Sequence, residues 1–257
     1  MVMKYPNTKF TGMSMVSKTE ISKAISAYYP NASQTGGAQR LALLKKATNL
    51  DELIDFCIDG YRAWGDAVLM GAGAYLKIGD YPTEIAEAKK YVKDEVYAYL
   101  TGCPFSSELD YDKWHEKVCV NLADNAKYFK GYSAYRKTAK DNFKNRTGFT
   151  IGNAQKFLNM LMKDLYACLS VDSKFLPLYE DYFKFCHMPL DSYILRFVDD
   201  IRHREGIKTT ARLYTWGNIG SYTDYIKEQN DIRYYVNKYN PTVSVLQTEF
   251  VIWPLYK

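Results

Sequence analysis

The sequence predicts an all-α fold. Apolar residues recur with a period of about 3.6 along most of the chain, which is the repeat of an amphipathic helix. No pair of alternating segments joined by a tight turn predicts a β-hairpin. The chain has 257 residues, of which 47% are apolar, so it can bury a substantial core. We therefore expect one all-α unit over residues 1–257, with two soft lobes (1–105 plus 209–257, and 106–208) and a cleft between them.

The apolar periodicity gives the order of the expected helices. Asp51 is a typical N-cap residue, and Pro82 with Thr83 is typical of a first helical turn. Glycine at 60 and the glycine-containing stretch 71–73 interrupt the pattern. The periodicity predicts helices over residues 17–29, 40–48, 51–69, 83–100, 110–130, 133–145, 152–169, 174–186, 190–204, 222–238 and 243–252.

Positive charge is concentrated in the middle of the chain. The formal net charge is +5, yet residues 127–146 alone hold seven basic residues against one acidic residue. Tyrosine and phenylalanine alternate with these charges. Such a segment suits the phosphates of a DNA backbone, and it equally suits a solvated helix face with its own core stripe.

Cysteine and histidine usage predicts neither a metal site nor a cofactor. The five cysteines form no Cys-x-x-Cys pair, and none of the three histidines pairs with another at i, i+4. An odd number of cysteines without a signal peptide predicts reduced thiols in a cytoplasmic protein. No apolar run reaches the roughly 18 residues of a membrane span. We expect a cytoplasmic monomer without a membrane partner.

Residues 145–170 carry the most informative pattern. A basic helix is expected to end near Asn145, a glycine-containing turn follows, and a second helix begins near Gly152. A helix, a tight hairpin and a helix can grip DNA, because backbone amides at the start of the second helix attract a phosphate. The residues expected to contact the DNA backbone are Arg136, Lys137, Lys140, Lys144, Arg146, Gly148 and Gly152.

The second helix of this hairpin has one apolar face, which includes Phe157, Leu161 and Leu165. Lys156 points away from that face, and Lys163 nearly shares its direction. Periodicity alone favours two solvated lysines, because that is where lysines usually lie. It also leaves Lys156 free to face a cleft.

The same region resembles a known enzyme family. Gly152-x-x-Gln155-Lys156, a second lysine at 163 and the aromatic-Ala-Cys run at 166–168 resemble the archaeal 8-oxoguanine DNA glycosylases. These form a divergent branch of the helix-hairpin-helix glycosylase superfamily. Pro189-Leu190-Asp191 resembles its Pro-hydrophobic-Asp motif, Thr215-Trp216 with Tyr225 and Gln229 resembles a further helix, and Glu249 with Trp253 resembles an acid-x-x-x-Trp pair. The resemblance covers residues 145–253.

The resemblance implies a role for each matched residue. Lys156 would be the nucleophile and Asp191 the catalytic carboxylate. Trp253, Glu249 and Trp216 would surround the flipped base. From the residues alone, Asp191 also suits a helix N-cap, and Trp253 also suits core packing.

The chain departs from the family in three respects. The Leu-Pro-Gly-x-Gly hairpin of the wider superfamily is absent, as it largely is in the archaeal branch. A four-cysteine iron–sulfur motif is also absent, and Glu249 stands where the archaeal enzymes have aspartate. The base-contacting residues of the N-terminal lobe cannot be matched, so the sequence does not identify the base.

The expected activity is therefore DNA N-glycosylase activity on double-stranded DNA that contains a modified base. Composition and analogy favour a bulky cytosine of phage DNA, α-glucosyl-hydroxymethylcytosine, excised in anti-phage defence. Repair of 8-oxoguanine, with or without a lyase step, is the alternative within the family. Two other classes stay open: an all-α ribonuclease of the HEPN type using Arg196 and His203, and a non-enzymatic helical module that binds nucleic acid.

Overall fold

The computed structural model describes residues 16–31, 47–60, 63–68, 82–124, 149–171, 179–207 and 216–257. Within these ranges the chain forms helices and connecting turns and no strand, so the predicted all-α class is confirmed. The α-helices are α1 (Lys18–Asn31), α3 (Leu50–Asp55), α4 (Ala63–Val68), α5 (Pro82–Thr101), α6 (Glu108–Asp124), α7 (Ile151–Val171), α9 (Ser192–Arg204), α10 (Tyr222–Tyr239) and α11 (Val245–Tyr256). A π-helical turn η2 (Phe56–Gly60) and the 3-10 turns η4 (Glu180–Phe183) and η5 (Trp216–Asn218) complete the elements.

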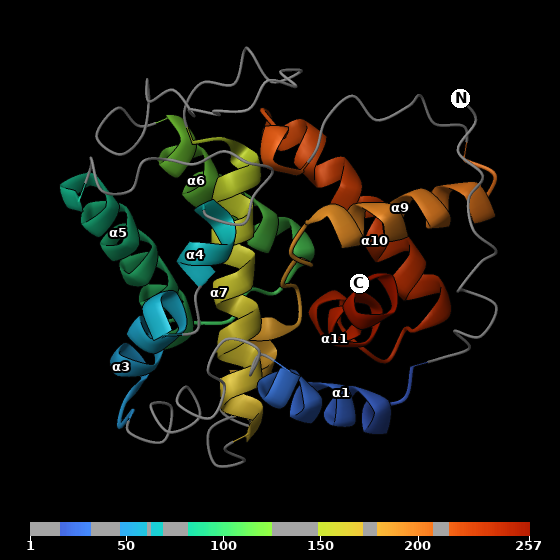
Figure 1. Cartoon of the computed structure of the whole chain (residues 1–257), viewed down its shortest axis with the longest axis horizontal. Helices are drawn as coiled ribbons and strands as arrows, with labels where there is room; N and C mark the ends of the chain where they lie inside the picture. The colour runs from blue at the N-terminus through green and yellow to red at the C-terminus, as the bar shows by residue number, and fades with distance from the viewer. Residues whose placement is uncertain are drawn as a thin grey trace.

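Helix α7 runs through the middle of the molecule (Figure 1). Helices α4 and α6 pack against it, as do α1 and α10, while α9 packs on both α10 and α11. Every residue from 151 to 169 is buried. A helix covered on all sides has no solvent face, so its polar side chains must find partners inside the protein.

Most predicted helices occur within a few residues of their expected bounds, and two do not. The expected helix 51–69 is broken into α3, η2 and α4, and it is capped by Asn49 rather than Asp51, because the Asn49 side chain accepts the Glu52 amide. The expected helix 174–186 is described only from residue 179 on. Tyr179 is helical, but the turn η4 follows it and residues 186–190 are without helix. The expected helix 133–145 and most of 40–48 lie outside the described residues.

Helices that were expected in different lobes pack against one another. Helix α9 lies in the range 106–208, whereas α10 and α11 lie in 209–257, and these three helices pack together. The division into lobes and the cleft between them stay predictions.

A glycine allows close contact between α7 and η5. A Cβ atom on Gly152 would lie 1.8 Å from the carbonyl oxygen of Trp216. The Gly152 amide donates to the Ile219 carbonyl at 3.0 Å. Only a residue without a side chain fits here, so Gly152 brings the start of α7 against η5.

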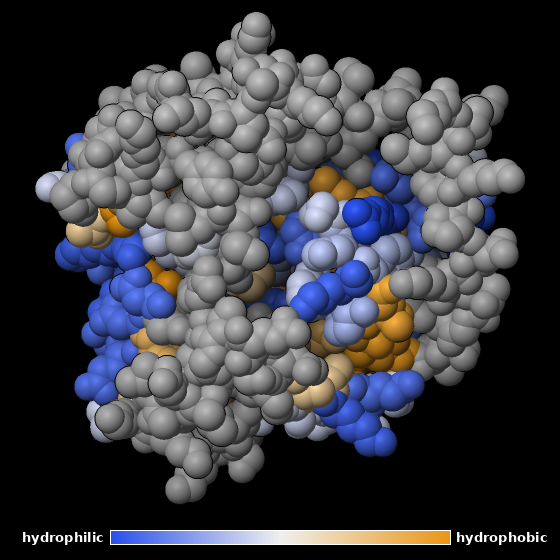
Figure 2. Space-filling model, viewed as in Figure 1, coloured by the Kyte–Doolittle hydropathy of each residue, from blue (hydrophilic) through white to orange (hydrophobic). Residues whose placement is uncertain are grey.

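The two sides of the molecule differ in surface chemistry. In Figure 2 the side that carries α3 and α5 is hydrophilic, while apolar side chains gather over α11. None of the described helices has both the length and the apolar character needed to cross a membrane.

Candidate functional site

Lys156 and Asp191, which are 35 positions apart in the sequence, meet in the structure. Lys156 Nζ lies 3.2 Å from Asp191 Oδ2, and their side chains are only 8% and 14% exposed. Asp191 is the N-cap of α9, and its Oδ1 accepts the amides of Tyr193 and Ile194 at 2.9 Å each. The indole Nε1 of Trp253 donates to Asp191 Oδ2 at 2.9 Å. Three helices, α7, α9 and α11, thus converge on one carboxylate.

The surroundings of Asp191 keep it ionised. Burial by itself raises the pKa of this carboxyl group, but the charge of Lys156, the Ile194 amide and the Trp253 indole together lower the pKa below its usual value. Asp191 is therefore a carboxylate at neutral pH, and it can stabilise a positive charge that develops beside it.

Two glutamines hold the segment that leads to Asp191. Gln155, the neighbour of Lys156, donates to the Leu190 carbonyl at 3.1 Å and accepts its amide at 3.2 Å. Gln229 donates to the Met188 carbonyl at 2.7 Å and accepts its amide at 3.2 Å. These side chains satisfy the backbone groups of Met188 and Leu190, which have no helical partners because residues 186–190 are not helical.

A second lysine–carboxylate pair lies beside the first. Lys163 Nζ is 2.6 Å from Glu249 Oε2, and the two side chains are 3% and 1% exposed. Burial raises the pKa of Glu249, and the charge of Lys163 opposes that rise; Asp191 and Lys156 also act on this group. The ammonium group of Lys163 lies 5.6 Å from the centre of the Trp253 ring. Trp253 is therefore in contact with both pairs.

A buried polar network anchors the other end of the held segment. His187 Nε2 lies 2.8 Å from Asp112 Oδ1, and its Nδ1 lies 2.7 Å from the Tyr225 hydroxyl. Arg233 forms two hydrogen bonds to Asp112, at 2.8 and 2.5 Å. The Tyr225 hydroxyl also accepts a hydrogen bond from Asn159 of α7 at 2.8 Å.

Burial lowers the pKa of His187 to about 4, although Asp112 opposes this shift. Hydrogen bonds from Arg233 and His187 hold the pKa of Asp112 below its usual value in spite of burial. At neutral pH the network therefore contains a neutral imidazole and an ionised Asp112–Arg233 pair.

The remaining predicted residues are distributed as follows. Trp216 is buried in η5 and lies against Gly152. Gly152 is one helical turn before Lys156 on α7. The Gly152 amide is engaged by Ile219 and is not available to a phosphate in this arrangement. Arg136, Lys137, Lys140, Lys144, Arg146 and Gly148 lie outside the described residues. Their DNA-binding role stays a prediction.

The paired lysines correct one expectation from periodicity. Lys156 and Lys163 were favoured as solvated residues, yet both are almost wholly buried. The network of Asp112, His187 and Arg233 was not predicted, because these residues lie on separate segments and no local sequence pattern links them.

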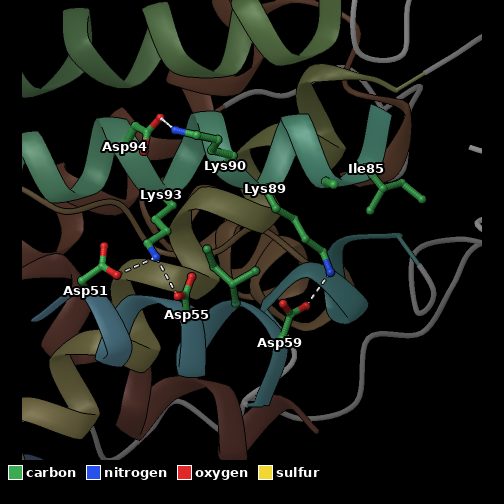
Figure 3. A pocket seen from close by; sticks show the side chains of 10 residues that line it. Asp51, Asp55, Asp59, Ile85, Lys89, Lys90, Lys93 and Asp94 are labelled. Carbon is green, nitrogen blue, oxygen red and sulfur yellow. Dashed lines mark hydrogen bonds and ion pairs between the residues drawn. The ribbon is translucent and has the colours of Figure 1, made fainter. Parts of the chain in front are cut away.

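A surface groove lies between α5 and the α3–η2 segment (Figure 3). Each of its three lysines pairs with at least one aspartate: Lys89 with Asp59, Lys90 with Asp94, and Lys93 with Asp51 and Asp55. The groove contains no residue of the Lys156–Asp191 site. Its four aspartates outnumber its three lysines, so it does not suit a phosphate backbone.

The Arg196–His203 pair of the ribonuclease alternative is exposed on α9. The Arg196 guanidinium lies 5.5 Å from the centre of the Tyr193 ring. The described residues contain no group of three or more histidine, cysteine, aspartate or glutamate side chains that could hold a metal ion.

Comparisons with protein-family models, with curated proteins and with solved structures find no match to this chain.

Proposed function

We propose that the chain is a DNA N-glycosylase in which Lys156 and Asp191 act on C1′ of a flipped nucleotide. One observation carries the proposal: the lysine and the aspartate of the two resembling motifs lie 3.2 Å apart. A primary amine beside a fixed carboxylate is suited to attack on a sugar carbon that becomes positively charged. The two motifs are 35 positions apart in the sequence, and the resemblance implies that their lysine and aspartate share one site, which this proximity supports.

The proposed reaction follows from the two groups. As the bond between C1′ and the base nitrogen breaks, its electron pair leaves with the base, and Asp191 stabilises the positive charge on the sugar. A proton from the Lys156 ammonium group goes to the departing base. The resulting neutral amine forms a bond to C1′. The sugar ring then opens as the bond between C1′ and O4′ breaks: O4′ keeps the electron pair and takes up a proton from the lysine nitrogen, which leaves a Schiff base on Lys156. Hydrolysis of this Schiff base releases an abasic site.

Access to the site requires local movement. Because Lys156 and Asp191 are 8% and 14% exposed, neighbouring side chains have to move before a nucleotide reaches them. Flipping the nucleotide out of the duplex also costs a few kcal/mol of stacking and pairing energy, less for a modified or mismatched base. The closed arrangement therefore disfavours entry of ordinary bases.

The proposed substrate is a modified base in double-stranded DNA, with α-glucosyl-hydroxymethylcytosine of phage DNA ahead of 8-oxoguanine. The order rests on composition and on analogy with glycosylases that attack hypermodified phage bases. A glucosylated cytosine needs a roomy polar pocket, whereas 8-oxoguanine needs a close aromatic sandwich. Direct comparison of the two DNAs decides between them.

The test uses two duplexes, one with each base, incubated with the purified protein and then treated with alkali to cut at abasic sites. We expect cuts in one duplex and a covalent protein–DNA adduct when borohydride is present. Lys156→Gln should abolish the adduct and most excision, and Asp191→Asn should abolish turnover while DNA binding is kept. Lys227→Gln is the matched control, because Lys227 is an exposed lysine on α10 outside the site.

Full excision by Asp191→Asn would refute the assignment of the site. DNA binding without excision of either base, unchanged in Lys156→Gln and Asp191→Asn, would instead support the non-enzymatic binding module.

A further inference from the structure

The Trp253 indole contacts one charged group of each ion pair of the site, Asp191 of the first and Lys163 of the second. Its N–H donates to Asp191 Oδ2 at 2.9 Å, and Lys163 lies 5.6 Å from its ring centre. Tyr193 packs against it edge-on, with ring centres 5.8 Å apart and an interplanar angle of 82°. A buried indole N–H needs an acceptor in any case, but here the acceptor is the carboxylate of the site, which indicates a more specific role.

We propose that Trp253 is a positioning residue, whose indole N–H holds the Asp191 carboxylate in its catalytic orientation while Lys156 reacts. This inference rests on the proposed glycosylase function. It assigns Trp253 to the aspartate, whereas the family resemblance implied a place around the flipped base.

The two carboxylate oxygens of Asp191 have different partners. Oδ1 is held by the amides of Tyr193 and Ile194 at the start of α9. Oδ2 is shared by Lys156 and Trp253. When Lys156 gives up its proton and bonds to C1′, its charged contact with Oδ2 is lost. The indole N–H is then the remaining donor on that oxygen among the described residues, and it keeps the oxygen in place.

The second ion pair supports the indole. Glu249 lies one turn before Trp253 on α11, and its partner Lys163 extends from α7 over the Trp253 ring. Both side chains are almost completely buried, so the pair is firmly located. Lys163 and Glu249 thereby restrict the ring whose N–H reaches Asp191.

The charged groups that act on Asp191 or lie near it are Lys156 from α7 and, further away, Glu249 from α11. Two more cations lie over the Trp253 ring, Lys163 at 5.6 Å and Lys257 at 5.0 Å from its centre. The Ile194 amide and the Trp253 indole donate to the carboxylate. A hydrogen bond to a carboxylate favours the ionised form. Removing the indole N–H should therefore make Asp191 bind protons more tightly, whereas loss of packing alone has no such specific effect.

Two substitutions distinguish the effect of the indole hydrogen-bond donor on Asp191 from the effect of the aromatic ring. Trp253→Phe keeps an aromatic ring and removes the donor, while Trp253→Gln keeps a donor and removes the ring. The Asp191 pKa is measured by carboxyl-carbon NMR in selectively labelled full-length protein, with Asp191→Asn identifying the signal. We expect Asp191 of Trp253→Phe to bind protons about tenfold more tightly than the wild-type group, because a charged hydrogen bond is lost. The Asp191 pKa in Trp253→Gln should lie closer to that of the wild type.

The control is Trp114→Phe, the same substitution at a half-buried tryptophan of α6 that stacks on Tyr99, with ring centres 4.8 Å apart. It should leave the Asp191 pKa unchanged. In single-turnover excision, Trp253→Phe should move the acidic limb of the pH–rate profile to higher pH while DNA affinity stays the same.

Two results would overturn the inference: a wild-type Asp191 pKa in folded Trp253→Phe, or a larger shift in Trp253→Gln than in Trp253→Phe. The second result would show that the ring acts through packing. A wild-type protein that excises neither base would refute the proposed function instead, and the NMR titration would still decide whether Trp253 holds Asp191.

Discussion

The two buried lysines of α7, Lys156 and Lys163, each form an ion pair with a carboxylate. Lys163 and Glu249 are 3% and 1% exposed, where an isolated charge would cost several kcal/mol of unfolding free energy. At a separation of 2.6 Å, the attraction between the two charges offsets much of that cost. Removing one partner is therefore more damaging than removing both.

We expect Glu249→Gln to lower the free energy of unfolding by about 3–5 kcal/mol, because it leaves the Lys163 ammonium buried without its carboxylate. The double variant Lys163→Met/Glu249→Leu should recover most of this loss. Urea denaturation at neutral pH measures both values. A double variant less stable than Glu249→Gln would contradict the argument that the unpaired charge causes the loss.

Contacts between elements depend on a few positions where backbones approach closely. Gly152 is the clearest case, because η5 lies directly against the start of α7. Gly206, just after α9, is different: its φ is +68°, and no atom lies within 4 Å of a Cβ built there. The two glycines are required for different reasons, steric at Gly152 and conformational at Gly206.

We expect Gly152→Ala to cost about 3 kcal/mol of unfolding free energy, because the methyl group overlaps the Trp216 carbonyl and forces α7 and η5 apart. Gly206→Ala should cost about 1–2 kcal/mol, the penalty for a left-handed residue with a side chain. Thermal and urea unfolding of both variants measure the difference. Equal losses would show that η5 moves away at little cost.

Stability of the whole molecule should depend on pH through its buried histidines. The unfolded chain binds a proton at each histidine near pH 6.5, whereas burial lowers the pKa of His187 to about 4 and that of His115 well below its usual value. Between these values the unfolded chain binds more protons than the folded one. Stability is then fully present above about pH 6.5 and is lost as the pH falls.

We expect the free energy of unfolding to fall between pH 7 and pH 4, by up to about 3 kcal/mol from His187 alone. Asp112 stays ionised across this range and does not cancel the effect. Urea denaturation as a function of pH measures the slope, and His187→Gln should reduce it. A flat profile would mean that the imidazoles are protonated in the folded state.

DNA affinity is also a property of the whole charge distribution. Replacing Lys137, Lys140 and Lys144 by glutamine should weaken binding to all DNA and reduce the slope of log affinity against log salt by about 2–3. Replacing the three groove lysines, Lys89, Lys90 and Lys93, is the control, since each is paired with aspartate. Fluorescence anisotropy with unmodified duplex measures both slopes. If both triple variants reduced the salt slope equally, DNA affinity would depend on net charge alone and not on the position of the lysines.

The sequence by itself determined the all-α class, the bounds of most helices and the N-cap at Asp191. These features depend on periodicity and capping within a few neighbouring residues. It failed at residues 180–186, where the expected helix is a 3-10 turn followed by backbone without helix. The sequence pattern also could not show that Gln155 and Gln229 bind the backbone of Leu190 and Met188, because both glutamines lie on other helices.

Tertiary structure alone decided which groups meet. Burial of Lys156 and Lys163, the choice of Asp191 and Glu249 as their partners, and the Trp253 hydrogen bond all depend on contacts between α7, α9 and α11. Such contacts form only when distant segments pack, and an amphipathic pattern on α7 cannot show that its polar face is covered as well. The physical reason is that a helical repeat records which side chains are apolar, whereas the partner of a buried charge is set by the geometry of the folded chain.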